Sequence, residues 1–479
     1  MEPTPRSPVT GILISLYVAE AAFVLILLGV YKAPALDAGL LCTKAGVALA
    51  AGGIGFAAGS WLIVRRIAMA GPIRGRAVSL AVSVNLFSVV LACLLAEGAV
   101  RAMASNTPAG IVVGTVRIRP TWRELVQRSR EALATVGPAR DGAESYFVHD
   151  PDLGWTVGPG RRSQDGLYSS SVEGIRSASP GLRLADVSSR FRVALVGDSN
   201  AFSLEVPFEE SWGYHLQQEL GDDVHVLNFG VDGYGFDQMM LRYERDVRSW
   251  RPDVVLIGFA QHDLVRAMAV YPFVAFGWPG YLVKPRFTIE HGKLNLLNAP
   301  LPGPDEILGA EGIEDLPWID YDLGYRTSDW SRRFEHGPLA MRVLTSAFPR
   351  WREEDPRFSR KTVVDLNGRL LAEIVGLIES DGAVPLVVYM SDPQARSESV
   401  SASLALAGVS PVNIANCLSD VPPSDRMVPS GHHFTGLANR AVAHCTASAV
   451  DEALPRPGGF SESSVEQLRE SPLSNGAKE

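Results

Sequence analysis

Four short segments of the chain carry side chains that could together perform nucleophilic catalysis. Gly197-Asp198-Ser199-Asn200 directly follows the apolar run Arg192–Gly197, so a serine hydroxyl lies at the end of a predicted strand. A glycine-rich segment follows at Asn228–Gly235, a polar segment at Gly258–Asp263 and a histidine segment at Ser430–Thr435. A serine becomes a nucleophile when a neighbouring base removes its proton, and N–H groups can then stabilise the oxyanion.

The elements that must position these segments alternate between strands and helices. We expect strands near residues 192–197, 224–230, 252–258, 384–389 and 408–415, and helices near residues 211–220, 236–250, 362–380 and 435–452. This alternation predicts an α/β fold, a three-layer α/β/α arrangement with a parallel sheet covered on both faces. Ligands bind at the carboxyl ends of the strands in such sheets, which is where the first three segments fall.

In order and placement, the four segments resemble the sequence blocks of the SGNH hydrolases, also called GDSL esterases and lipases. The resemblance covers about Phe191–Leu454 and is closest to a membrane-anchored bacterial subgroup with a flavodoxin-like sheet. It implies that Ser199 is the nucleophile, that His433 is the base and that the Gly233 N–H donates to the oxyanion. It also implies that no metal or organic cofactor is needed.

Two positions depart from the pattern of that family. His262 stands where the family has Asn in Gly-x-Asn-Asp; a histidine N–H can also donate to an oxyanion, but it titrates near neutrality. Ser430 stands where the family has Asp in Asp-x-x-His, so it cannot supply a carboxylate to the base. Asp425 is one candidate for the missing carboxylate, and a Ser–His dyad is the other possibility. His432 is an alternative base, one position from His433.

Three apolar stretches precede the catalytic segments, near Gly11–Tyr31, Ala38–Val64 and Val78–Val100. Each is long enough to cross a bilayer, which takes about 20 helical residues. The loop Arg65–Arg76 carries four arginines and no acidic residue, which predicts a cytoplasmic loop. The sequence thus predicts three transmembrane helices in the cytoplasmic membrane, with the N-terminus inside and the catalytic domain outside, periplasmic or extracellular.

The 479 residues therefore divide into four predicted parts. Residues 1–101 form the membrane anchor, and residues 102–190 a lead-in region that packs on the next domain. Residues 191–454 form the hydrolase domain, and residues 455–479 a polar, disordered tail. An insertion at residues 265–360, with a hairpin near residues 284–296, is expected to act as a lid or a substrate wall, as long insertions often do.

The predicted function is an extracytoplasmic serine esterase that cleaves an O-acyl ester on a glycan or lipid. A net charge of -9 argues against nucleic acid as a partner, since phosphate binding needs a basic face. Two alternatives stay open. An O-acyltransferase would pass the acyl group to an envelope or exported polysaccharide, and it would need a membrane partner as acyl donor because three helices are too few to carry one across. A catalytically degenerate member would bind glycan only.

Cys417 and Cys445 are the only cysteines beyond the apolar N-terminal region, and they lie on either side of His433. Outside the cytoplasm a disulfide between them would persist, and it would close a loop of roughly 28 residues around that histidine. The sequence does not show whether their Cβ atoms come within bonding range. A disulfide and two separate buried thiols therefore both remain open.

Overall fold

The computed structural model of the chain describes residues 75–107, 110–136, 145–327, 330, 338–347, 355–391 and 396–454, together with Ala58 and Arg65. Contacts divide the chain into two units, Met1–Trp122 with Arg326–Glu353, and Arg123–Tyr325 with Glu354–Glu479. The predicted insertion at residues 265–360 thus contributes to both units. The predicted span Gly11–Tyr31, the predicted span Ala38–Val64 apart from Ala58, and the predicted tail lie outside the described residues.

The second unit is built on a six-stranded sheet with the order β13-β10-β8-β9-β7-β6. Its strands are β6 Ser169–Ser170, β7 Arg176–Ser177, β8 Phe191–Gly197, β9 Val224–Asn228, β10 Val254–Phe259 and β13 Val384–Tyr389. The strands β13, β10, β8 and β9 run parallel, whereas β7 pairs antiparallel with β9 and β6 antiparallel with β7. The sheet is therefore mixed and not parallel throughout, because two short strands of the predicted lead-in region extend it beyond β9.

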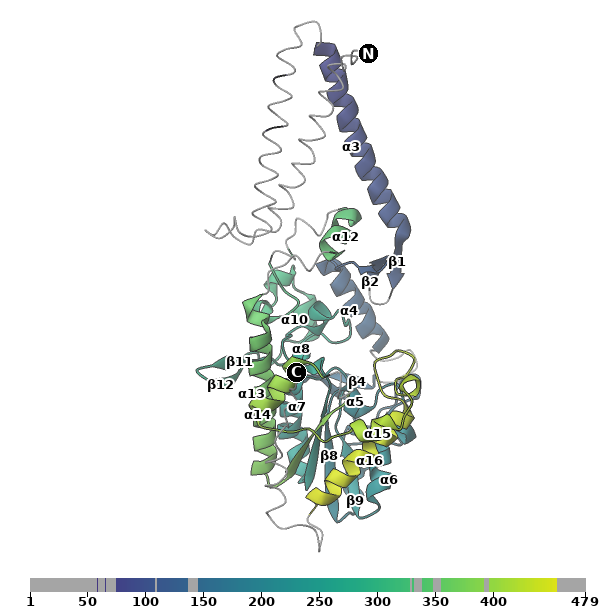
Figure 1. The fold of residues 1–479 in the computed structure, drawn as a ribbon, viewed down its shortest axis with the longest axis vertical. Helices are drawn as coiled ribbons and strands as arrows, with labels where there is room; N and C mark the ends of the chain where they lie inside the picture. The colour runs from purple at the N-terminus through teal and green to yellow at the C-terminus, as the bar shows by residue number, and fades with distance from the viewer. Residues whose placement is uncertain are drawn as a thin grey trace, which may run out of the picture. The chain divides into compact units, whose positions relative to one another are not determined.

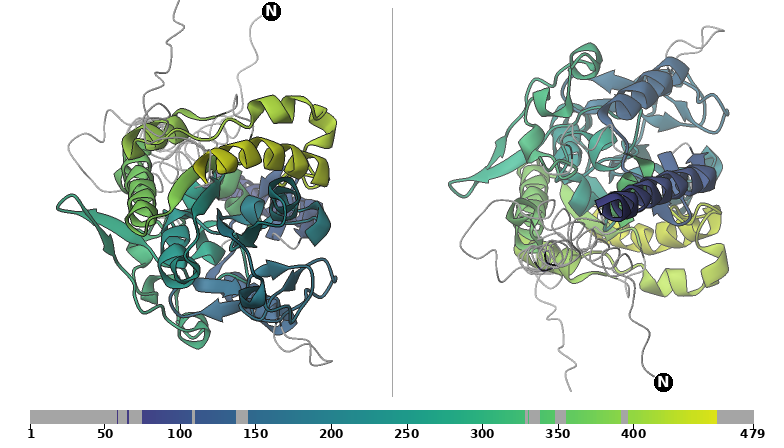
Figure 2. Two further views of the ribbon diagram at one scale, coloured as in Figure 1. Left: turned by 90° about the horizontal axis from the view of Figure 1, so that it is seen from below. Right: turned by 90° about the horizontal axis from the view of Figure 1, so that it is seen from above.

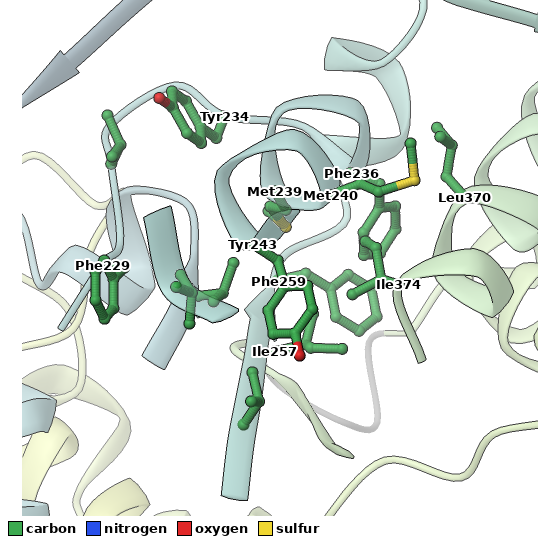
Figure 3. Close-up of a cluster of buried hydrophobic side chains, with 14 of the residues drawn as sticks. Phe229, Tyr234, Phe236, Met239, Met240, Tyr243, Ile257, Phe259, Leu370 and Ile374 are labelled. Atoms are coloured by element: carbon green, nitrogen blue, oxygen red, sulfur yellow. The ribbon is translucent and has the colours of Figure 1, made fainter. Parts of the chain in front are cut away.

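Helices cover both faces of this sheet, as the sequence predicted (Figure 1, Figure 2). One face carries α7 Phe236–Arg242, α13 Arg360–Ser380 and α14 Glu398–Ala407, and the other carries α6 Trp212–Leu220, α15 Ala415–Ser419 and α16 Gly436–Ala453. Side chains of β8 alternate between the two apolar cores, as the period of a strand requires. Ala194 and Val196 pack in the core of α7 and α13 (Figure 3), and Val193 and Leu195 in the core of α6 and α16.

The predicted fifth strand at residues 408–415 is wrong. Gly408 ends α14 in the left-handed conformation, with φ at 70°, which suits a glycine. The segment that follows reaches the sheet through a hydrogen bond from the Val412 N–H to the Val387 carbonyl at 2.8 Å, and α15 then begins. The predicted hairpin is confirmed, since β11 Phe287–Glu290 pairs antiparallel with β12 Lys293–Leu296.

Shorter elements complete the second unit and position its loops. They are the hairpin of β4 Phe147–Asp150 and β5 Gly154–Val157, and the helices α4 Trp122–Val136, α5 Ser199–Phe202, α8 Asp263–Arg266, α9 Pro272–Ala275 and α10 Pro304–Leu308. The helix predicted at residues 236–250 continues beyond α7 as a π-helical turn at Tyr243–Val247 and a 3₁₀ turn at Arg248–Trp250.

The first unit contains α3 Gly75–Met103, α12 Leu339–Ala347 and an antiparallel sheet of β1 Ala104–Thr107, β2 Gly110–Val113 and β3 Val116–Arg117. The Glu97 carboxylate accepts the N–H groups of Leu339 and Ala340, both at 2.9 Å, and so caps the first turn of α12. The predicted span Val78–Val100 falls within α3. Across the described part of the chain, no helix has the length and apolar character needed to cross a membrane.

Buried charges hold residues 265–325 of the insertion in place within the second unit. Lys284, 1% exposed, donates from Nζ to the fully buried carboxylate of Asp237 in α7, and to the Pro285 carbonyl at 3.0 Å. The buried Asp322 carboxylate accepts the N–H groups of Val270 at 2.7 Å and Tyr271 at 2.6 Å. The described residues 265–325 are thus anchored by internal ion pairs and hydrogen bonds, which suits a wall better than a lid.

Asp237→Asn tests this anchoring. The variant leaves the buried Lys284 ammonium without its counter-ion, so we expect a loss of about 3–5 kcal/mol in the free energy of unfolding. Urea unfolding of the full-length protein, followed by tryptophan fluorescence, measures this loss. Asp365→Asn is the matched control, because Asp365 pairs with Lys361 on the exposed surface of α13 and its loss should change little. Equal stabilities of Asp237→Asn and the control would contradict the anchoring role.

Candidate active site

Ser199 lies at the junction between the central strand β8 and the short helix α5. Asp198 caps this helix, and its Oδ1 accepts the Asn200 N–H at 2.9 Å. Ser199 is 1% exposed, and its Oγ has no hydrogen-bond partner in the described part of the chain. The Ser199 N–H belongs to the first turn of α5, where no helix carbonyl can accept it. The hydroxyl and the N–H of Ser199 are therefore both uncommitted.

The second sequence block holds α5 in place. Asn228, at the end of β9, donates from Nδ2 to the Ala201 carbonyl at 2.9 Å. A Cβ on Gly230 would lie 2.5 Å from the Phe202 backbone nitrogen, so only glycine allows this close approach. The glycine-rich block thus supports the helix that carries Ser199.

Gly233, the predicted oxyanion donor, lies in the same loop with φ at 80°, a conformation that favours glycine. A Cβ at this position would lie 3.2 Å from the Trp155 ring and 3.3 Å from the Trp278 ring. Within the described residues, the Gly233 N–H has no hydrogen-bond acceptor. This N–H is therefore available to an oxyanion, and the role of Gly233 as an oxyanion donor stays a prediction.

His433 contacts a carboxylate that the sequence analysis missed. Its Nδ1 lies 2.5 Å from Oε2 of Glu205, and the Ser430 hydroxyl donates to the same oxygen at 2.7 Å. Burial alone would raise the pKa of Glu205, but the hydrogen bonds from His433 and Ser430 hold it below its ordinary value, so the carboxylate stays charged. With Nδ1 bonded to Glu205, Nε2 of His433 is the nitrogen left to act as a base.

Glu205, and not the candidate Asp425, is the carboxylate that contacts His433. Asp425 accepts from the neighbouring Ser424 hydroxyl at 2.9 Å, and the described structure contains no contact between Asp425 and His433. His432 is exposed, and its N–H donates to Ser430 Oγ at 3.3 Å. Glu205 belongs to no motif; the only signal in the sequence is an acidic residue six positions after the nucleophile.

His262 contacts the residue that caps the nucleophile helix. Its Nε2 lies 3.0 Å from Asp198 Oδ2 and 3.5 Å from Asp263 Oδ1. Burial alone would lower the pKa of His262, but the carboxylates of Asp263 and Asp198 outweigh this effect and raise it. Since Nε2 is committed to Asp198, only Nδ1 remains to donate to an oxyanion. Nδ1 can carry its proton together with Nε2 only in the charged imidazolium.

Arg266 completes this cluster and bears on its metal-binding potential. Its Nη1 donates to Asp263 Oδ1 at 2.8 Å and to Asp198 Oδ2 at 3.2 Å. Burial and the charge of Asp198 raise the pKa of Asp263 to about 7. Ligand atoms of Asp198, His262 and Asp263 lie within 4.8 Å of one another, the spacing of a possible metal site. The guanidinium already supplies the positive charge that a metal ion would bring, so the cluster fits a hydrogen-bond network better.

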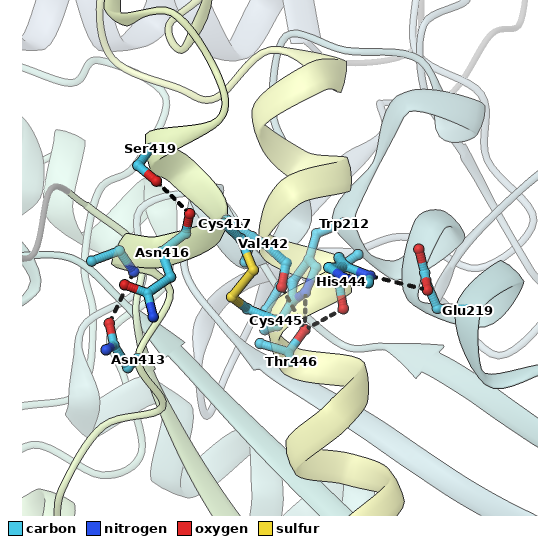
Figure 4. Close-up of a disulfide and its surroundings, with 12 residues drawn as sticks. Trp212, Glu219, Asn413, Asn416, Cys417, Ser419, Val442, His444, Cys445 and Thr446 are labelled. Atoms are coloured by element: carbon cyan, nitrogen blue, oxygen red, sulfur yellow. Dashed lines mark hydrogen bonds and ion pairs between the residues drawn. A yellow bond between two sulfur atoms is a disulfide. The ribbon is translucent and has the colours of Figure 1, made fainter.

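A disulfide joins the helices on either side of the histidine loop. Cys417 of α15 bonds to Cys445 of α16, with their Cα atoms 6.0 Å apart (Figure 4). The bond that the sequence left open is thus present. It closes the 28-residue segment that contains His433, and it should stabilise the fold by about 3.5 kcal/mol in the chain-entropy model.

The geometry of His262 predicts an alkaline decline in activity. As pH rises through the raised pKa of His262, Nδ1 loses its proton and one oxyanion donor is lost. His262→Asn donates at every pH, so the decline should disappear, whereas His262→Ala should lose roughly 10²–10³-fold in kcat. The pH dependence of kcat for p-nitrophenyl acetate measures both effects, with the exposed His432→Asn as the control. An alkaline decline that persists unchanged in His262→Asn would rule out His262 as the donor.

Known proteins resemble the chain through structure alone. No protein-family model matches it, and neither does any curated protein. The structure of TesA shares 13% identity over 55% of this chain and 99% of its own, with a TM-score of 0.29. The lipase/acylhydrolase of Enterococcus faecalis shares 11% identity over 56% of this chain and 100% of its own, with a TM-score of 0.29. A putative lipolytic protein of the G-D-S-L family from Desulfitobacterium hafniense shares 11% identity over 54% of this chain and 98% of its own, with a TM-score of 0.28. Two of these three structures are described as a lipase/acylhydrolase and as a lipolytic protein of the G-D-S-L family.

Proposed function

We propose that the chain is a serine esterase that cleaves O-acyl esters of a glycan or lipid outside the cytoplasmic membrane. The observation that carries the proposal is the contact of His433 with Glu205. Glu205 lies in the loop that follows α5, the helix that begins at Ser199, whose hydroxyl has no partner among the described residues. A carboxylate on Nδ1 fixes the tautomer in which Nε2 accepts a proton, and it stabilises the imidazolium that forms. The base and the carboxylate that orients it thus come from distant parts of the sequence, and the carboxylate lies six residues after the proposed nucleophile.

Each step of the proposed reaction can be assigned to a named residue. His433 Nε2 takes the proton of Ser199, and Ser199 Oγ attacks the ester carbonyl carbon to form a tetrahedral intermediate. The N–H groups of Ser199 and Gly233, with Nδ1 of the His262 imidazolium, receive the oxyanion. The His433 imidazolium then gives its proton to the leaving alkoxide as the carbon–oxygen bond breaks. Water then attacks the acyl-enzyme through the same steps, and the carboxylic acid is released, which restores Ser199.

Glu205 also bears on the two alternative functions. A degenerate, glycan-binding protein was suggested by the lack of a carboxylate at Ser430, and Glu205 supplies that carboxylate to His433. An O-acyltransferase would use the same acyl-enzyme, with a sugar hydroxyl in place of water. Product analysis with and without a polysaccharide acceptor separates the two reactions: free acid indicates the esterase, and an acylated acceptor indicates the transferase.

Ser199→Ala and His433→Ala test the mechanism, and His432→Ala is the control. We expect the first two variants to lose at least roughly 10³-fold in kcat/KM for p-nitrophenyl acetate, because each removes an atom that takes part in bond making. His432→Ala should stay within about threefold of the wild type, since that side chain is exposed and lies outside the proposed proton path. Wild-type turnover by Ser199→Ala would refute the proposal.

The proposed location is supported by three separate features. The sequence has three apolar stretches before residue 101, and the Arg65–Arg76 loop suits the cytoplasmic side. The Cys417–Cys445 disulfide suits an oxidising compartment. An acyl ester of an envelope glycan or lipid would be accessible to the active site there.

Reporter fusions test this location. A phosphatase reporter that is active only outside the cytoplasm should be active when it is fused after Arg101, because the sequence predicts three crossings before that point. The same reporter inserted within Arg65–Arg76 should be silent. The reverse pattern would place the site in the cytoplasm and exclude an envelope substrate.

A further inference from the structure

The loop that follows the nucleophile helix has an unusual backbone conformation. Ser203 and Glu205 both adopt the left-handed conformation, with φ at 60° and 68°. Residues with side chains rarely take this conformation, and it persists only where surrounding groups enforce it. Because Glu205 is also the residue that contacts His433, the groups that fix this loop determine where its carboxylate lies.

Arg176 of β7 binds the backbone of this loop on both sides of Glu205. Its Nη1 donates to the carbonyls of Phe202 at 2.5 Å and Ser203 at 2.8 Å, and its Nη2 donates to the Val206 carbonyl at 2.7 Å. One planar guanidinium thus spans the segment that contains both left-handed residues. An ammonium could not reproduce this fixed fork of donors.

Tyr168 binds Glu205 directly. The Glu205 N–H donates to the Tyr168 hydroxyl at 2.8 Å. The guanidinium of Arg176 lies over the Tyr168 ring, 5.1 Å from its centroid, and 4.3 Å from the centroid of Phe202. The tyrosine and the arginine therefore hold each other as well as the loop.

The burial of Arg176 indicates more than a packing role. It is 3% exposed, and among the described residues no carboxylate forms a salt bridge with it. Burial lowers the pKa of Arg176 to about 10. A buried charge without a salt-bridge partner is costly, and an apolar residue would fill the same space at less cost. The charged guanidinium instead donates hydrogen bonds to the carbonyls of Phe202, Ser203 and Val206.

We propose that Arg176 and Tyr168 are positioning residues that hold residues 202–206 in the conformation in which Glu205 reaches His433. The inference rests on the proposed function and deepens it. Tyr168 and Arg176 both belong to the predicted lead-in region, so the inference gives that region a part in the site. Both residues act through Glu205 and not through a contact with the substrate.

A double-mutant cycle with Glu205→Gln tests the proposal in the full-length protein. Arg176→Lys should lower kcat for p-nitrophenyl acetate roughly 10–100-fold with little change in KM, because it displaces the carboxylate that orients the base. In the Glu205→Gln background the same substitution should change kcat less than about twofold, since the group it positions is already gone. Arg242→Lys is the matched control, because Arg242 is also buried and donates to the Gly174 carbonyl, away from residues 202–206.

A second readout follows the histidine itself. In the ¹⁵N-histidine-labelled protein, with the His433 signal assigned from His433→Gln, the downfield proton resonance of Nδ1–H, which reports the hydrogen bond to Glu205, should move upfield in Arg176→Lys and in Glu205→Gln. Arg242→Lys should leave it in place. A merely structural role of Arg176 would not produce this selective change.

Each outcome decides the proposal. Additive losses in kcat, or an unmoved Nδ1–H resonance of His433 in Arg176→Lys, would overturn it. If Arg176→Lys does not fold, Tyr168→Phe enters the same cycle, because it removes only the hydroxyl that accepts the Glu205 N–H. If the wild type hydrolyses no ester, the proposed function fails, and the Nδ1–H resonance of His433 alone then supports or refutes the positioning role.

Discussion

The contact between Glu205 and His433 depends on one backbone constraint, the left-handed conformation of Ser203 and Glu205. Such residues cost on the order of 1–3 kcal/mol each, so the surrounding structure must compensate. Arg176 and Tyr168 supply that compensation through hydrogen bonds to the loop backbone. Strain in the loop thereby turns a carboxylate only six residues from the nucleophile towards a histidine more than two hundred residues away in sequence.

A second network, centred on Asp198, links the nucleophile to the third sequence block. One carboxylate caps α5 through Oδ1 and binds His262 and Arg266 through Oδ2, so the start of the nucleophile helix and the proposed oxyanion donor share a partner. Arg266 also lies under Trp278, which approaches Gly233. The insertion that carries Trp278 is fixed by the buried Lys284–Asp237 pair, so the wall beside Gly233 belongs to the folded core.

The sequence predicted what periodicity and motifs can encode. Apolar runs predicted the central strands, and the first three blocks predicted that Ser199, Gly233 and His262 follow the strands β8, β9 and β10. It did not predict the antiparallel edge, because strands of two residues have no periodicity. Residues 408–415 are apolar enough for a strand but make a single backbone hydrogen bond to the sheet. Glu205 could not be found by motif, because its role depends on a loop conformation that Arg176 of β7 and Tyr168, just before β6, enforce.

The central claim is that Ser199 is activated by a His433 that Glu205 orients, and the rate of covalent labelling by a fluorophosphonate measures this most directly. The account predicts that peptide mass spectrometry finds the adduct on Ser199. It also predicts labelling roughly 10²-fold or more slower in Glu205→Gln and unchanged in Glu209→Gln, which alters an exposed carboxylate nearby. An adduct on another residue, or equal labelling rates in the wild type and Glu205→Gln, would contradict the account.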